Sequence, residues 1–160
     1  MTLREAGRAD ADAVWKIMQP IVRGGESYAI PTDFSREESL DYWFLPVHEV
    51  WVAEQEGEIL GTYYLRANGK GGACHAANCG YMTDIGAGGR GIASQMCLHS
   101  LERARQRGFL AMQFNFVIAS NERAVRLWEK HGFTTVGRMP RAFLHPHLGF
   151  VDALVMHRFL

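Results

Sequence analysis

The hydrophobic and polar positions of the chain follow two periods, one typical of helices and one typical of strands. Apolar residues recur every three to four positions over residues 92–107, while most charged residues lie off that stripe. Residues 10–22 repeat the pattern, and Asp10 is expected to cap this helix. Ser35-Arg-Glu-Glu38 matches a capping box for a shorter helix. Residues 121–131 form another amphipathic segment, which Ser120 or Asn121 is expected to cap.

Shorter apolar or alternating runs separate these helices and predict strands. They cover residues 3–6, 49–55, 58–66, 75–83, 109–118, 133–138 and 150–159, with a hairpin turn at Glu56-Gly57 and a loop at 141–149. The resulting order, β-α-α-β-β-β-α-β-α-β-β, predicts one α/β domain over residues 1–160. Its central sheet is expected to be mixed but mostly antiparallel, with helices on its faces.

The stretch from Tyr81 to Ser94 contains the strongest chemical signal, because a strand end, a glycine-rich turn and a helix start follow one another. Its glycines lack Cβ atoms and permit positive φ, so successive backbone N–H groups can converge at the helix N-terminus. These glycines are Gly86, Gly88, Gly89 and Gly91, with Arg90 among them. Such a nest suits a pyrophosphate, whereas a glycine cluster alone is also typical of a flexible surface loop.

Composition narrows the function classes. Lys plus Arg and Asp plus Glu both number 17, so the formal net charge is zero, and no basic block indicates a nucleic-acid partner. The three cysteines lack CxxC spacing and fit a reducing compartment. No apolar run reaches membrane-spanning length, and the N-terminus lacks the apolar core of a signal peptide. We therefore expect a cytoplasmic protein without a membrane partner.

Other candidate features favour structural roles. His145 and His147 flank Pro146, but no third ligand accompanies them, so no metal is expected. Cys97 lies on the core side of its predicted helix and is a poor candidate for a nucleophile. A cluster of aromatic residues between the first two helices favours packing over a ligand wall. It consists of Tyr28, Phe34, Tyr42 and Trp43.

Two other phosphate-binding motifs can be compared with the glycine turn. Residues 86–91 match the G-x-G-x-x-G pattern of dinucleotide-binding domains. They lie in mid-chain after a hairpin, however, and no acidic residue ends the following strand. A Walker A motif is excluded because no Lys-Ser/Thr pair follows the glycines.

Two segments resemble the signature motifs of the GNAT superfamily of N-acetyltransferases: residues 88–93 with the helix that follows, and residues 121–133. The resemblance extends over the whole chain in element order. It implies the GNAT-type sheet, acetyl-CoA as co-substrate, no metal and, by analogy, a homodimer. The fourth and fifth strands would splay apart to admit the pantetheine arm. The implied cofactor-binding residues are Tyr81, Met82, Thr83, Gly88, Gly89, Arg90, Gly91, Ile92, Ala93, Ser94 and Asn121.

Two positions depart from the family pattern. Gly88 stands where the family often has glutamine or arginine, which removes a side-chain contact to phosphate but leaves backbone binding intact. Trp128 stands where the family often has a tyrosine that acts as general acid, seven residues after Asn121. An indole cannot protonate a leaving thiolate. This departure keeps open a non-catalytic acyl-CoA sensor or interaction domain.

A further resemblance lies in the C-terminal half, in Phe114-Asn-Phe-Val117, Asn121, Trp128, Gly132-Phe133, Val136-Gly-Arg138 and Val151-Asp-Ala-Leu154. These residues are similar to those of the yeast N-acetyltransferase that detoxifies proline analogues such as azetidine-2-carboxylate. That resemblance implies that Asn78 and Asn115, with the adjacent Phe116, bind a small amino acid. A buried strand asparagine needs partners, and its amide can pair with both a carboxylate and an amine. The alternative is that both asparagines satisfy backbone groups where the two strands diverge.

The reaction implied is direct acetyl transfer from acetyl-CoA to the amine of a small molecule or amino acid. Protein N-termini and side chains are less favoured acceptors. A backbone N–H near Met82 or Thr83 is expected to meet the developing oxyanion. An ammonium acceptor must first lose a proton, and the candidate bases are Glu26, Tyr81 and Asp84. Each of these three also fits a cap, turn or core role.

Overall fold

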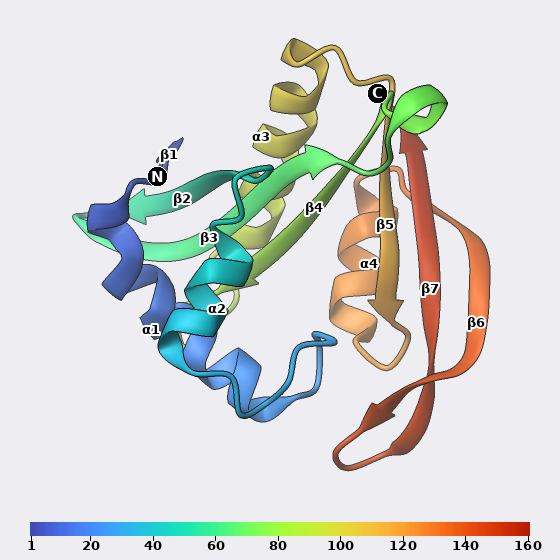
Figure 1. The fold of residues 1–160 in the computed structure, drawn as a ribbon, viewed down its shortest axis with the longest axis horizontal. Helices are drawn as coiled ribbons and strands as arrows, with labels where there is room; N and C mark the ends of the chain where they lie inside the picture. Colours follow the sequence, from blue (N-terminus) through green and yellow to red (C-terminus); the bar gives the residue numbers. More distant parts are fainter.

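A seven-stranded mixed sheet forms the centre of the protein in the computed structural model, which describes residues 1–160 (Figure 1). The spatial order is β1-β2-β3-β4-β5-β7-β6, and every neighbouring pair is antiparallel except β4 and β5. This confirms the predicted α/β architecture. The strands are β1 (Thr2–Glu5), β2 (Glu49–Gln55), β3 (Glu58–Ala67), β4 (Ala76–Thr83), β5 (Ala111–Ile118), β6 (Thr134–His145) and β7 (Gly149–Phe159).

Four α-helices cover the two faces of the sheet, and each pair buries its own apolar cluster. The helices are α1 (Ala11–Gly24), α2 (Arg36–Trp43), α3 (Ile92–Gln106) and α4 (Glu122–Lys130). The cluster under α1 and α2 includes Ile17 and Trp43, and the cluster under α3 and α4 includes Met96 and Trp128. Strand residues of β3 and β4 alternate between the two clusters, as pleating requires.

The parallel pair β4 and β5 is joined at one end only. Its register comprises Ala76 with Ala111 and Ala77 with Met112, after which the strands separate. Figure 1 shows the two ribbons meeting near the C-terminus and diverging along their length. Beyond the separation, β5 shifts register against β7 between Phe114 and Val117. The sheet therefore opens in its middle, which the resemblance implied.

Most predicted boundaries are confirmed within a few residues, but the expected loop at 141–149 is wrong. Strand β6 continues to His145, and only a short turn separates it from β7. A register shift between Met139 and Phe143, with a positive φ of 53° at Arg141, marks a bulge that the sequence pattern suggested as a loop. Because β6 is an edge strand, Pro140 is tolerated within it.

The caps are confirmed at α2 and α4 but not at α1. Ser35 and Glu38 form the predicted capping box, and the Asn121 side chain accepts a hydrogen bond from the Ala124 N–H. Asp10 precedes α1, but its side chain makes no cap; it pairs with Arg4 and accepts from the Gly7 N–H instead. No helix is long and apolar enough to cross a membrane.

Candidate active site

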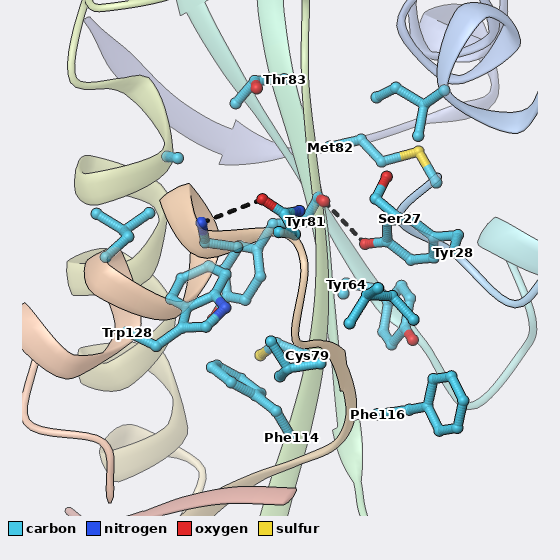
Figure 2. A pocket seen from close by; sticks show the side chains of 18 of the residues that line it. Ser27, Tyr28, Tyr64, Cys79, Tyr81, Met82, Thr83, Phe114, Phe116 and Trp128 are labelled. Carbon is cyan, nitrogen blue, oxygen red and sulfur yellow. Dashed lines mark hydrogen bonds between the residues drawn. The ribbon is translucent and has the colours of Figure 1, made fainter. Parts of the chain in front are cut away.

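A cavity of about 570 Å³ lies where β4 and β5 separate. Residues of both strands form its walls, the glycine turn and α4 close one end, and the segment after α1 covers another side. Figure 2 shows side chains from these elements around one space, with Trp128 on one side of β4 and Tyr28 on the other. The cavity therefore gathers most of the residues that the sequence singled out.

The backbone of β4 presents alternate residues to this cavity. Asp84 N–H donates to Leu60 and Ala76 C=O accepts from Asn68, so even-numbered residues of β4 pair with β3. Alternation then directs the N–H and C=O groups of the odd-numbered residues Tyr81 and Thr83 toward the opening. The Tyr28 hydroxyl donates to the Tyr81 carbonyl at 2.8 Å, consistent with this direction (Figure 2).

The glycine turn after β4 leaves its backbone donors free. No N–H group from Gly88 to Ser94 donates a hydrogen bond within the protein. Gly89 and Gly91 have φ values of 80° and 74°, which side chains other than glycine rarely adopt. Gly91 precedes the first turn of α3, where the helix dipole adds positive potential. The arrangement suits an anion, as the sequence predicted.

A second hollow of about 280 Å³ adjoins the glycine turn and shares Gly88 and Ala93 with the larger cavity. Its far side is formed by basic residues of α4, namely Arg123, Arg126 and Lys130. Sequence reasoning missed these three, although their spacing of three and four residues places them on one helix face. They add positive charge where phosphate groups are expected.

Some expected cofactor residues have other local roles. Arg90 is exposed and lines neither hollow, so its side chain does not join the nest in this conformation. Ser94 lies 2.7 Å from His131 through Oγ and Nε2, which links α3 to the end of α4. Asn121 lines the cavity while its Oδ1 caps α4. Met82 is nearly fully buried, and its N–H is directed toward β3.

Asn78 lies in the half of β4 that is farther from the glycine turn, and Asn115 lies in the middle of β5. Asn78 is buried, and its Nδ2 donates to the Gln113 carbonyl at 2.9 Å across the diverging strands. Asn115 is exposed rather than buried as expected, because it lies in the bulged part of β5. Its amide accepts from Gln113 and donates to Asn68, so both polar atoms have protein partners. Both side chains, with Phe116, line the cavity.

The candidate bases differ in their surroundings. Glu26 does not line the cavity, and its carboxylate lies 3.5 Å from Nε2 of His147. Asp84 lines the cavity but accepts a hydrogen bond from the Gly86 N–H as a turn cap. The Tyr81 hydroxyl pairs with Ser100 Oγ at 2.7 Å, and burial raises its pKa well above the ordinary value. None of the three combines a free basic atom with the acceptor end.

Aromatic and thiol groups of the cavity wall are neutral at physiological pH. Trp128 packs against Tyr81 and Phe114, with ring centroids 4.9 and 5.0 Å apart. Burial raises the pKa of Tyr28 well above its ordinary value and that of Cys79 to about 12. Tyr28 and Tyr42 line the cavity, so two members of the aromatic cluster for which packing was favoured over a ligand wall also form part of the cavity wall.

Comparison with known proteins identifies the chain's relatives. The model of the acetyltransferase (GNAT) family matches residues 13–133. N-acetyltransferase aca1 of Schizosaccharomyces pombe is 28% identical over 148 residues, covering 82% of this chain and 71% of the yeast protein. A GCN5-related N-acetyltransferase from Kribbella flavida is 34% identical, with a TM-score of 0.94 and coverage of 99% of this chain and 97% of that one.

A phosphinothricin acetyltransferase of the GNAT superfamily from Sinorhizobium meliloti, solved with acetyl-CoA, shares the fold. Its TM-score is 0.86 at 23% identity, covering 99% of this chain and 88% of that one. The residues present here fit acetyl-CoA, because free backbone N–H groups and basic side chains face the phosphate end of the cavity. Acetyl-CoA is therefore the co-substrate, and the chain belongs to the GNAT family of acetyltransferases.

Proposed function

We propose that the protein transfers acetyl directly from acetyl-CoA to the amine of a small molecule or amino acid bound between β4 and β5. The observation that carries the proposal is the single cavity that runs from the glycine turn to Asn78. One end offers free N–H groups for phosphates, and the other offers aromatic and amide groups for a small acceptor. A direct transfer needs both ligands in one space.

At the cofactor end, we propose that the N–H groups of residues 88–94 bind the pyrophosphate. Arg123 and Lys130 add charge beside them. The odd-numbered residues of β4 beyond Ala77 would pair with the pantetheine arm, since β5 does not pair with them there; of these groups, the Tyr81 carbonyl already accepts from the Tyr28 hydroxyl. Asn121 would lie beside that arm. Acetyl-CoA supplies the activated acetyl group as a thioester.

At the reacting centre, the protein contributes orientation and a backbone donor. The N–H of Tyr81 or Thr83 faces the opening and would donate to the acetyl carbonyl oxygen as it gains negative charge. The N–H of Tyr81 or Thr83 therefore replaces that of Met82 as the candidate donor, because the Met82 N–H is directed toward β3. Since no free carboxylate faces the acceptor end, the amine would release its proton to water before it attacks the carbonyl carbon. The C–S bond would then break as the C–N bond is completed, and the CoA thiolate would take its proton from water or from the nitrogen that has attacked.

At the acceptor end, we propose that Asn78 and Phe116 contact the small molecule, with Asn115 at the edge of the acceptor site. Asn78 Oδ1 accepts no hydrogen bond from the protein, so it is available to an amine. Asn115 is tied to Gln113 and Asn68, and it would contribute by holding those neighbours in place. The ring centroids of Phe116 and Phe143 are 6.4 Å apart, and Phe116 forms an apolar rim at the acceptor end of the cavity.

The proposal is tested by thiol release from acetyl-CoA with purified protein and a panel of acceptors. The panel contains azetidine-2-carboxylate, proline analogues, primary amino acids, polyamines and a short peptide. We expect turnover with small amines to exceed that with the peptide at least about tenfold, because the acceptor end is walled by Tyr28, Tyr64 and Phe116. Mass spectrometry of the product would confirm an N-acetyl group.

The alternative function is an acyl-CoA sensor, and Trp128 is the specific reason to test it in the same assay. An indole donates no proton to a thiolate, so a sensor would bind acetyl-CoA tightly and release no thiol above the background hydrolysis. Tight binding without release across the whole panel would contradict the enzymatic proposal. Preference for the peptide would contradict the small-acceptor part alone.

A further inference from the structure

Arg66 of β3 is a charged residue of the cavity wall that has no partner within the protein. Its half-buried side chain lines the cavity and makes no hydrogen bond or ion pair within the protein, and its Nε atom is fully buried without a partner. Burying the Nε–H group of a guanidinium without an acceptor costs free energy, and buried polar groups usually have a partner in the functional state. Sequence reasoning did not single out this residue.

The position of Arg66 places it at the acceptor end. It is the cross-strand partner of Asn78, whereas Thr83, at the glycine turn, pairs with Gly61. Asn78 and Thr83 are five positions apart in β4, or about 17 Å along the strand. Arg66 is therefore too far from the glycine turn to serve the pyrophosphate.

The walls beside Arg66 contain no compensating anion. The charged side chains that line the cavity are Arg66, Asp84 and Arg123, and the last two lie toward the glycine turn and α4. Tyr64 lies beside Arg66 and crosses β4 at Gly80, where a Cβ atom would meet a Tyr64 ring carbon at 2.5 Å. The acceptor end thus combines the permanent positive charge of one arginine with neutral aromatic and amide groups.

We propose that Arg66 binds the carboxylate of the acceptor, so that the preferred substrates are small amino acids rather than simple amines. The guanidinium would hold the carboxylate through two parallel hydrogen bonds, the geometry that arginine favours. Asn78 is the cross-strand neighbour of Arg66, and its Oδ1 would accept from the amine. The Cα atoms of Asn78 and Tyr81 are about 10 Å apart along β4, a span that the Asn78 side chain, the amine and the acetyl group would fill together. This proposal rests on the proposed function and specifies its substrate class.

The test compares acceptors that differ only in the carboxylate: alanine with alaninamide, and azetidine-2-carboxylate with azetidine. Each rate is divided by the fraction of acceptor whose amine is neutral, because replacing the carboxylate lowers the pKa of the neighbouring amine. We expect kcat/KM of the wild type to favour each acid at least about thirtyfold, the size of a charge-assisted bidentate contact. Arg66→Gln should remove that preference by lowering kcat/KM for the acids alone, and Arg66→Lys should restore part of it.

Arg8→Gln serves as the matched control, because Arg8 is exposed and lines neither hollow. It should leave the preference unchanged. Calorimetry should show that Arg66→Gln binds acetyl-CoA with the same affinity as the wild type. That result would separate a defect in acceptor binding from misfolding. Equal rates with acids and amides, or a preference that survives Arg66→Gln, would overturn the carboxylate proposal while leaving acetyl transfer intact.

Binding of the product provides a second readout that does not depend on turnover. N-acetylalanine retains the carboxylate, so saturation-transfer NMR in the presence of CoA should detect its binding to the wild type and its loss in Arg66→Gln. Absence of turnover with every acceptor, together with this binding pattern, would overturn the enzymatic proposal but support the anion site. Equal binding of N-acetylalanine to both proteins would overturn the anion site.

Discussion

Gly91→Asp is expected to raise the Kd for acetyl-CoA at least about a hundredfold. The substitution places a carboxylate at the start of α3, where the free N–H groups of residues 88–94 converge. A like charge beside a pyrophosphate is repulsive, and the new side chain also competes for the same donors. Isothermal titration calorimetry with acetyl-CoA measures the effect directly.

Gly57→Asp is the matched control for backbone strain and added charge. Gly57 has a φ of 81°, close to the 74° of Gly91, and a Cβ atom at either position would meet nothing within 4 Å. Gly57 lies in the β2–β3 turn and lines neither hollow. Both variants should lose similar stability, but Gly57→Asp should keep the wild-type Kd. An equal loss of affinity in the two variants would argue against a phosphate site at the glycine turn.

Trp43→Ala is expected to lower the free energy of unfolding by about 3–5 kcal/mol. Trp43 is fully buried at the end of α2, and its Nε1–H donates to Thr62 Oγ1 at 3.0 Å. Its ring also supports two walls of the cavity, with centroids 6.2 Å from Tyr28 and 5.0 Å from Tyr64. Truncation would leave a void and would remove one of the two hydrogen bonds of the Thr62 hydroxyl, which also donates to the Trp51 carbonyl. Urea unfolding followed by circular dichroism measures the loss.

Trp15→Ala provides the comparison, since it removes the same side chain from the half-buried side of α1. Trp15 packs at the edge of the same cluster and stacks with Arg23 at 5.8 Å. Its removal should cost about 1 kcal/mol, because an exposed edge collapses more readily than a filled core. Equal destabilisation by both substitutions would show that Trp43 is not the central packing residue of this face.

Local patterns were sufficient to predict the elements that position the cofactor end. Glycine spacing, the amphipathic stripe of α3 and the cap at Asn121 depend on neighbours in the sequence, so each could be interpreted without the fold. The β2–β3 hairpin was predicted for the same reason, from Glu56 and Gly57. These interactions have short range and leave a clear signature.

The acceptor end could not be predicted in the same way, because it depends on strands that are distant in sequence. The exposure of Asn115 follows from the bulge of β5 against β7, which no periodicity encodes. The role of Arg66 emerges only when β3 and β4 are paired and its Nε is found without a partner. A weak signal was present, since Arg66 shares the inward face of β3 with Tyr64.

The continuation of β6 shows a third kind of limit. The sequence suggested a loop over residues 141–149, whereas in the structure a bulge with a positive φ at Arg141 interrupts the strand only locally. Pairing with β7 resumes from Phe143 to His145, so tertiary hydrogen bonds override the local signal. The bulge is visible only through its partner strand.

Hydrogen–deuterium exchange with and without acetyl-CoA tests the location of the cofactor site most directly. In the free protein, the amides of residues 88–94 have no protein acceptor and should exchange rapidly. Saturating acetyl-CoA should slow their exchange, and that of Tyr81 and Thr83, at least about tenfold. The glycine-rich loop at 69–73 should not change. Bound acetyl-CoA that leaves residues 88–94 unprotected would contradict the site between β4 and β5.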